Sequence, residues 1–323
     1  MRAAVCPAYG PPDVVRVEDL PAPVLTDRQV RVRVTAAAVN FPDVLLVAGR
    51  YQVKVPPPFV PGSEFAGVIT ETSGDTGDFT VGARVTGTGM VGAFAEEVAA
   101  DPAMLARIPD GVDERTAAAS GVAFRTAYHA LRSVARVRPG EGVIVLGAGG
   151  GVGLAAVALA TALGARVIAV ASSAAKLDAA TRHGAAAVID HRNTDLRAAL
   201  KQALPDGAAA VLDPVGGDLS EPALRSLRRG GRFVTIGFAS GTIPRIPLNL
   251  VLVKGIQIVG FQFQDVDAAE FTRNEAELAD LLASGAVTPH IGARFPLAET
   301  AAALRHVADG YAIGKVIIDI GGQ

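Results

Sequence analysis

The segment VIVLGAGGGVG, from Val143 to Gly153, decides the fold of this chain because five glycines in seven positions follow an apolar, β-branched run. The run is typical of a buried strand, and LAAVALATALG at 154–164 is typical of a helix. Glycines at the turn between them leave the backbone bare where another group must approach closely. The segment therefore predicts a strand, a tight turn and a helix, the arrangement in which dinucleotide-binding loops occur.

Within this loop, the motif reads Ala148-x-Gly150-x-x-Gly153. Gly150 would let the backbone approach a pyrophosphate, and Gly153 would let the helix pack tightly on the sheet. The phosphates would lie at the positive end of a helix predicted from Gly151 to Leu163. The alternative is a tight turn without a ligand, which the neighbouring strands and helices disfavour. The predicted cofactor-binding residues of the loop are Ala148, Gly149, Gly150, Gly151, Val152 and Gly153.

Towards the C-terminus, apolar strands alternate with segments of helical length. The six predicted strands contain VIVL at 143–146, RVIAVA at 166–171, AAVID at 186–190, AAVLD at 209–213, RFVTIGF at 232–238 and IQIVGFQF at 256–263. Parallel neighbours need crossover connections, so this alternation predicts a doubly wound, six-stranded parallel sheet. We assign residues 122–266 to this Rossmann domain.

Towards the N-terminus, short β-like runs alternate with glycine and proline. They include QVRVRVTAAAV at 29–39, FAGVITET at 65–72 and ARVTGTG at 83–89, which predict a compact β-rich domain. The tail from Asp267 contains two helical segments and a last strand, KVIIDI at 315–320. We expect this tail to return to the first domain, so that 1–121 and 267–323 form one unit.

Composition excludes several other classes of protein. The chain has 323 residues, a net charge of −2 and no dense basic run outside Arg225 to Arg232, so nothing favours nucleic acid or a membrane as a partner. No signal peptide or membrane-spanning stretch is visible, and we expect a cytoplasmic protein. The single cysteine, Cys6, excludes an intramolecular disulfide and a zinc site made of several thiolates.

The end of the second predicted strand indicates which dinucleotide is bound. An acidic residue there would bond the ribose hydroxyls of NAD, but VIAVASSAAK places Ala171, Ser172 and Ser173 at that point, with Lys176 close behind. Hydroxyl groups and an ammonium suit a 2′-phosphate, which favours NADPH (NADP+). The alternative for Lys176 is a solvated position on the following helix.

Motifs along almost the whole chain now identify a resemblance. They include AAVNFPDVLLVAGRY at 37–51, PPFVPGSEFAGVI at 57–69, FRTAYHAL at 124–131, the glycine loop, VLDPVGG at 211–217 and GKVII at 314–318. The chain resembles the medium-chain dehydrogenase/reductase superfamily, and within it the zinc-less quinone oxidoreductase (zeta-crystallin-like) branch. This resemblance implies an α/β fold with a GroES-like β-rich catalytic domain, and a homodimer joined through the sixth strand of the parallel sheet.

The resemblance also allows a prediction of whether the protein binds a zinc ion. Zinc-dependent relatives place a cysteine before x-x-Asp and a histidine in Gly-His-Glu, whereas this chain has Asn40-Phe-Pro-Asp43 and Gly62-Ser63-Glu64. Amide and hydroxyl groups are poor zinc ligands compared with thiolate and imidazole, so we predict no metal. Without a Lewis acid, hydride from NADPH would go best to an already electrophilic acceptor, a quinone or an α,β-unsaturated carbonyl compound.

Matching of motifs supplies the remaining candidate residues. Asn40, Asp43 and Tyr51 lie in the stretch that in relatives lines the active-site cleft. Asn40 would bond cofactor or substrate, and Tyr51 would donate a proton or hydrogen bond unless it only covers the cleft. The candidates for cofactor contact are Thr126 and Gly237, Phe238 and Ala239 at the nicotinamide, and Ser172, Lys176 and His191 at the 2′-phosphate.

Two points stay open at this stage. Relatives commonly have a tyrosine at the position of His191, whose charge depends on pH, and the neighbouring Arg192 is a possible substitute. The alternative functions are a 2-enoyl thioester (enoyl-CoA/ACP) reductase and a weakly catalytic NADPH-binding protein. RNA binding by the latter is disfavoured because no basic patch is interleaved with aromatic residues.

Overall fold

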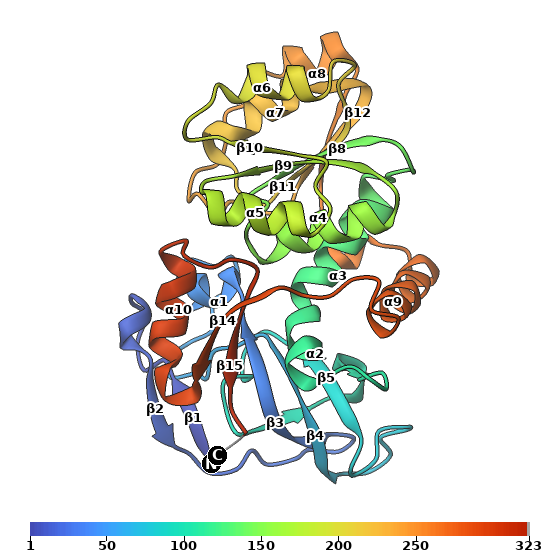
Figure 1. Ribbon diagram of the computed structural model, residues 1–323. Helices are drawn as coiled ribbons and strands as arrows, with labels where there is room; N and C mark the ends of the chain where they lie inside the picture. The colour runs from blue at the N-terminus through green and yellow to red at the C-terminus, as the bar shows by residue number, and fades with distance from the viewer. Residues whose placement is uncertain (322–323) are drawn as a thin grey trace. The chain divides into compact units, whose positions relative to one another are not determined.

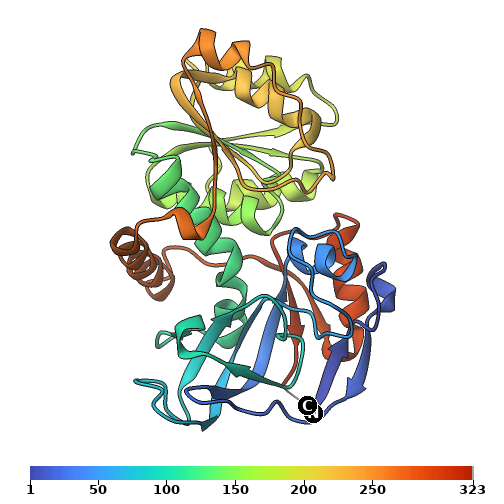
Figure 2. The same cartoon turned by 180° about the vertical axis from the view of Figure 1, so that it is seen from behind.

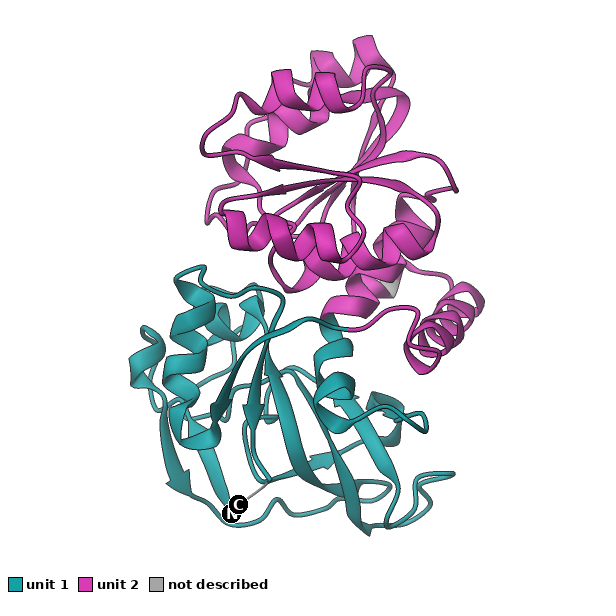
Figure 3. Cartoon of the chain, viewed as in Figure 1, with its two compact units in different colours: residues 1–122, 289–323 teal, residues 123–288 magenta. Residues whose placement is uncertain are grey.

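A computed structural model describes residues 1–321 (Figure 1). Residues 322–323, the end of the expected segment 267–323, lie outside the described residues. Contacts along the chain separate two compact units, Met1–Val122 with Pro289–Gln323, and Ala123–Thr288 (Figure 3). We expected the chain to leave the nucleotide-binding domain at Asp267, but residues 267–288 lie in the second unit.

The second unit contains a six-stranded sheet in which every pair of neighbouring strands is parallel. Its order is β10-β9-β8-β11-β12-β13. The strands are β8 (Gly142–Leu146), β9 (Arg166–Ala171), β10 (Ala187–Asp190), β11 (Ala208–Asp213), β12 (Leu227–Thr235) and β13 (Gln257–Gly260). The chain runs outward from β8 to β10 and then crosses back to β11. The predicted doubly wound sheet is therefore confirmed, with its change of direction between β8 and β11.

Helices cover both faces of this sheet (Figure 1). One face carries α4 (Gly151–Ala162) and α5 (Ala174–Arg182), and the other carries α6 (Leu196–Ala203), α7 (Ser220–Arg225) and α8 (Asn249–Lys254), as the view from behind also shows (Figure 2). The segment LSEPALRSLRRGG at 219–231, which has the length of a helix, is helical in α7 only as far as Arg225. Leu227 instead pairs with Ala208 and begins β12.

The first unit is built on a seven-stranded sheet and a separate pair, β1 (Arg2–Val5) with β2 (Arg16–Asp19). The larger sheet has the order β14-β15-β3-β4-β5-β7, and β6 also pairs with β3. Its strands are β3 (Val30–Val39), β4 (Glu64–Thr72), β5 (Arg84–Thr88), β6 (Glu97–Ala100), β7 (Leu105–Arg107), β14 (Ile291–Pro296) and β15 (Lys315–Asp319). The C-terminal β15 lies antiparallel to β3, which places Lys315 beside the end of β3.

Alternation explains why β3 has one face in the core. Val30, Val32 and Val34 are buried, whereas Arg31 and Arg33 between them are partly exposed or exposed. The helices of this unit are α1 (Phe41–Val47), α2 (Glu114–Ser120) and α10 (Thr300–Ala308). Short helical turns are η1 (Pro12–Val14), η2 (Pro102–Met104) and η6 (Leu297–Glu299) here, and η4 (Gly217–Leu219) and η5 (Phe263–Asp265) in the second unit.

The segment beyond Asp267 stays with the second unit because its helix packs on an earlier one. Helix α3 (Val122–His129) continues into a π-helical turn, η3 (Ala130–Val134), and α9 (Ala268–Ala283) lies against both. The buried ring of His129 contacts Glu275 at 2.9 Å, and the Asn274 amide donates to Ser133 at 2.9 Å. Sequence periodicity predicted a helix here, but not these contacts. No helix within residues 1–321 is long and apolar enough to cross a membrane.

Candidate functional site

The glycine loop lies where β8 ends and α4 begins. Gly147 adopts a φ of +60°, and a Cβ at Gly153 would lie 2.1 Å from the Gly147 carbonyl oxygen, so the start of α4 can pack here only with glycine. At Gly150 a Cβ would meet a single atom, 3.5 Å away. Gly150 is also the N-cap and has no side chain to accept from the first turn of α4. The helix N-terminus is thus open to an anion.

Cationic groups gather beside this loop, at the carboxyl ends of β9 and β10. The stem of Lys176 covers Gly149, where a Cβ would lie 2.5 Å from its Cβ. Burial and the charge of Arg192 lower the pKa of Lys176. Burial, then Arg192 and more weakly Lys176, lower the pKa of His191, which the Asp190 carboxylate partly opposes. These shifts mean that Lys176, His191 and Arg192 are close enough to repel one another when charged.

Backbone and capping contacts produce this convergence. The His191 N–H donates to the Ala171 carbonyl at 3.2 Å, which brings the end of β10 to the end of β9. The Asp190 carboxylate accepts from the Arg192 N–H at 3.0 Å, an arrangement that lowers the pKa of Asp190. Ser173 is the N-cap of α5, and its hydroxyl accepts from the Lys176 N–H at 3.4 Å, so its role is local to the helix start.

The segment Gly237 to Ala239 follows β12 and runs beside the loop after β11. The Gly237 N–H donates to the Asp213 carbonyl at 3.3 Å, and the Ala239 N–H to the Pro214 carbonyl at 3.1 Å. Phe238 has 39% of its surface exposed. Both loops lie at the carboxyl end of the sheet, where open α/β sheets bind ligands. Thr126, the other predicted nicotinamide contact, lies on α3 and is buried.

In the first unit, Asn40 and Asp43 form the N-terminus of α1. The Asp43 carboxylate accepts from the Asn40 N–H at 2.7 Å in a capping box, with Asn40 as the N-cap. Asp43 is fully buried, and its Oδ1 has no hydrogen-bond partner among residues 1–321. Burial raises the pKa of Asp43 to about 7, against the opposing effects of the Asn40 N–H and Ser63.

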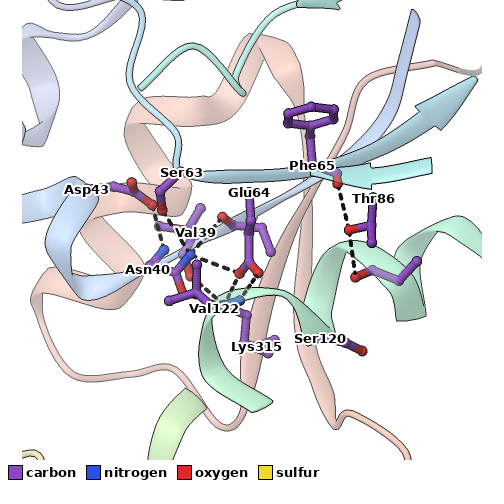
Figure 4. A network of polar contacts seen from close by, with 12 residues as sticks. Val39, Asn40, Asp43, Ser63, Glu64, Phe65, Thr86, Ser120, Val122 and Lys315 are labelled. Carbon is purple, nitrogen blue, oxygen red and sulfur yellow. Dashed lines mark hydrogen bonds and ion pairs between the residues drawn. The ribbon is translucent and has the colours of Figure 1, made fainter. Parts of the chain in front are cut away.

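The Asn40 side chain contacts a buried ion pair, formed by Lys315 and Glu64 (Figure 4). The Lys315 ammonium donates to Glu64 Oε1 at 2.5 Å and to Asn40 Oδ1 at 2.6 Å. The Asn40 amide donates to Glu64 Oε1 at 2.8 Å and to Ser63 Oγ at 3.2 Å. Both amide hydrogens and the amide oxygen of Asn40 are thus engaged within the protein. We expected this group to bond cofactor or substrate, whereas the structure directs it into the polar cluster.

Tyr51 lies apart from this cluster. It follows α1 in an irregular segment and packs, half-buried, against the apolar core of the first unit. Its backbone N–H donates to the Leu45 carbonyl at 3.2 Å, and within residues 1–321 its hydroxyl has no hydrogen bond. The Tyr51 hydroxyl is therefore uncommitted, in contrast to the Asn40 amide.

Sequence reasoning missed three residues that shape these regions. Glu64 is fully buried, and Lys315 is 3% exposed. In the sequence, each is a charged residue within an otherwise mostly apolar motif, PPFVPGSEFAGVI and GKVII, and this could have indicated a buried ion pair. Asp213 accepts from the N–H groups of Val215 and Gly216, each at 2.8 Å, and holds the loop after β11. Its signal was an aspartate before proline and two glycines at the end of a strand.

The side chains at the matched zinc positions do not fit a zinc ion. Asn40 and Ser63 supply an amide and a hydroxyl rather than thiolate or imidazole, and the Lys315 ammonium already occupies the amide oxygen of Asn40 and an oxygen of the neighbouring Glu64. Across the described part of the chain, no three His, Cys, Asp or Glu side chains are grouped to hold a metal ion.

Comparisons with known proteins agree with this architecture. Residues 26–110 match the family model described as Alcohol dehydrogenase GroES-like domain, and residues 151–284 match the one described as Zinc-binding dehydrogenase. The chain is 38% identical over 324 residues to Quinone oxidoreductase-like protein 2 of Mus musculus, a match that covers 99% of this chain and 92% of the relative.

Two solved structures are also similar. A quinone oxidoreductase of Escherichia coli complexed with NADPH has a TM-score of 0.90 and 28% identity, over 99% of this chain and 100% of that one. A mycobacterial protein complexed with NADPH has a TM-score of 0.91 and 31% identity, over 98% and 99%. The predicted two-domain fold, GroES-like and Rossmann, is confirmed. The chain belongs to the quinone oxidoreductase family of the medium-chain dehydrogenase/reductase superfamily.

Proposed function

We propose that this protein binds NADPH and reduces a quinone or an α,β-unsaturated carbonyl compound without a metal ion. The observation that carries the proposal is the convergence of Lys176, His191 and Arg192 beside the glycine loop. Repulsion between the Lys176 and Arg192 charges, near the ends of β9 and β10, would be relieved by an added dianion, and a 2′-phosphate is one. NADH lacks that phosphate, so the cluster favours NADPH.

The chain's own residues bind and orient this cofactor. The open first turn of α4 would hold the pyrophosphate through backbone N–H groups of Gly151 and Val152, and Gly150 leaves room for its approach. Ser172 and Lys176 would hold the 2′-phosphate with Arg192. When bound, the cofactor supplies hydride from its nicotinamide ring.

The acceptor follows from the side chains that the protein offers. No metal-type donor set is present at the matched positions, so polarisation of an unreactive carbonyl or alcohol is not available to it. A quinone or enone is already electrophilic, and it needs only hydrogen bonding of the oxygen that becomes negative. Tyr51 is our candidate for that bond, because its hydroxyl is the uncommitted donor among the first unit's predicted residues.

The first experiment measures oxidation of NADPH and NADH in parallel, with a chelator present. The acceptors are 1,4-benzoquinone, 9,10-phenanthrenequinone, a short enone and crotonyl-CoA. We expect chelator-resistant turnover with NADPH, and the best acceptor distinguishes quinone or enone reduction from thioester reduction. Turnover that disappears with chelator and returns with zinc would overturn the metal-free mechanism. Binding of NADPH without any turnover would favour a weakly catalytic binding protein.

We also propose that the protein is a homodimer in which a second copy pairs with β13. This strand is an edge of the parallel sheet, and Ile258 on it is 40% exposed. The adjacent helix α8 has no buried residue, and Leu252 and Val253 are 82% and 70% exposed. An uncovered apolar edge of this kind promotes association. Light scattering should give twice the chain mass for the wild type and a lower mass for Ile258→Lys; a monomeric wild type contradicts the proposal.

A further inference from the structure

The ion pair of Lys315 and Glu64 is unusually enclosed for two charged groups. Glu64 is fully buried and Lys315 is 3% exposed. An ammonium removed from water is tolerated only when oxygen atoms surround it. Lys315 meets this requirement with Glu64 Oε1 at 2.5 Å, Asn40 Oδ1 at 2.6 Å and the Val39 carbonyl oxygen at 3.4 Å. The ammonium is therefore coordinated by three oxygens from β3, β4 and the start of α1.

These partners include positions that the family's metal-binding members use differently. Asn40 stands at the position of a zinc-ligating cysteine, and Glu64 directly follows the position of the histidine, which is Ser63 here. The donor set around Lys315 is amide, carboxylate and backbone oxygen, rather than the thiolate and imidazole that zinc prefers. The positive charge among these oxygens is the Lys315 ammonium, which belongs to the chain itself.

We propose that the Lys315 ammonium is the built-in cation of this cluster, and that it positions Asn40 and Glu64 in place of a metal ion. An ammonium and a divalent cation would compete for the same oxygens, since like charges repel and each oxygen has few lone pairs. The native protein therefore has no vacancy for a metal among these side chains. Removing the ammonium leaves an oxygen-lined space next to a buried carboxylate.

The cation also acts on the backbone through Glu64. While Oε1 holds Lys315, Glu64 Oε2 accepts from the Val122 N–H, the first residue of α3, at 2.6 Å. Gly121 permits this approach, because a Cβ there would lie 2.8 Å from Glu64 Oε2. Lys315 thus fixes the carboxylate that caps α3, and Thr126 lies one turn further along that helix. Lys315 is a positioning residue, remote from the chemistry proposed above.

The test removes the ammonium and then returns a cation from solution. Lys315→Ala creates the space, and Lys315→Met is the matched control, because it has a similar length and no charge but fills the space. The readout is the melting temperature with added ethylammonium, with ethanol as the neutral analogue, and with Mn²⁺ or Zn²⁺. This readout does not depend on the acceptor or on turnover, so its failure is distinguishable from failure of the proposed function.

We expect both variants to melt roughly 10 °C below the wild type, because a buried carboxylate has lost its partner. Ethylammonium or a divalent cation should raise the melting temperature of Lys315→Ala, whereas ethanol should not. Neither cation should stabilise Lys315→Met or the wild type. Adding Glu64→Gln to Lys315→Ala should abolish the response to cations, because the carboxylate that attracts them is gone.

Three results would overturn the proposal. One is a wild type that gains stability from a stoichiometric divalent cation and loses it with chelator. Another is a folded Lys315→Ala that responds to no cation, and the third is an equal response of Lys315→Met. If Lys315→Ala is insoluble, the soluble yield on refolding with ethylammonium or ethanol replaces the melting temperature, and equal yields contradict the proposal.

Discussion

The polar cluster of the first unit and the cationic cluster of the second differ in how their charges are balanced. Around Lys315, each charge meets an opposite charge or a hydrogen-bond partner, and Glu64 and Lys315 are almost wholly buried. Around Lys176, like charges face one another, and Arg192 is exposed. A buried ion pair of this kind positions the backbone, whereas cationic side chains gathered near the surface favour an anionic ligand. We therefore propose a positioning role for Asn40 and a ligand-binding role for Lys176.

The prediction with the largest effect concerns Asp43, whose carboxyl is fully buried beside the Lys315 cluster and whose Oδ1 has no hydrogen-bond partner among residues 1–321. Its folded-state pKa is raised from 3.8 to about 7, so the folded protein retains a proton that the unfolded chain releases. Stability from this group is fully present below about pH 4 and is lost as the pH rises through 7. Asp43→Asn should therefore be more stable than the wild type at pH 8, by up to about 4 kcal/mol, with little difference at pH 4.

Denaturant unfolding of both proteins across this pH range measures the effect. Asp110→Asn, at an exposed carboxyl in the same unit, is the matched control and should follow the wild type. A wild type and Asp43→Asn whose curves stay parallel from pH 4 to 8 would show that Asp43 is ionised in the fold, and the buried cluster would then be fully charged.

The second prediction tests the cationic cluster directly. Lys176→Glu replaces attraction for a 2′-phosphate with repulsion, so the KM for NADPH should rise by about 100-fold and that for NADH by only a few-fold. Steady-state kinetics with both cofactors measure the split. Arg182→Glu, near the other end of α5, makes the same charge change away from the cluster and should leave both constants unchanged. An equal rise in KM for NADPH and NADH would show that the 2′-phosphate does not bind at this site.

The third prediction tests whether the Tyr51 hydroxyl of the first unit donates a proton or hydrogen bond to the acceptor that is reduced. Tyr51→Phe should lower kcat by at least about tenfold with little change in the KM for NADPH, because a proton or hydrogen bond to the reduced oxygen is lost. The control is Tyr9→Phe, whose hydroxyl donates to the Val55 carbonyl at 2.8 Å. An unchanged kcat would make Tyr51 a covering residue only.

The smallest expected effect belongs to His191. Its pKa is lowered in the free protein, chiefly by burial, and a bound phosphate favours the protonated ring. Preference for NADPH over NADH should accordingly decline about threefold as the pH rises from 6 to 8. His191→Tyr cannot gain this charge, so its preference should vary less with pH. A steeper decline in the variant than in the wild type would exclude His191 from the phosphate site.

Local patterns predicted much of this architecture correctly. Apolar β-branched runs marked the strands of both sheets, and the glycine spacing at 147–153 placed the loop between β8 and α4. These features depend on neighbours in sequence, so periodicity and turn chemistry suffice to find them. The strand β14 was missed because IGARFP has little strand character, and it forms by pairing with β15, which sequence alone does not reveal.

The amino-acid sequence by itself determined the doubly wound sheet, the glycine loop, and the absence of thiolate and imidazole at the matched zinc positions. Only the tertiary structure decided what Asn40 and Lys315 do, because their partners lie on strands and turns 275 residues apart in the chain. It also decided that Arg192 stands with Lys176 and His191, since two parallel strands must first align their ends. Hydrogen bonds and charge pairs act over a few ångströms in space, and residue spacing along a chain does not specify those distances.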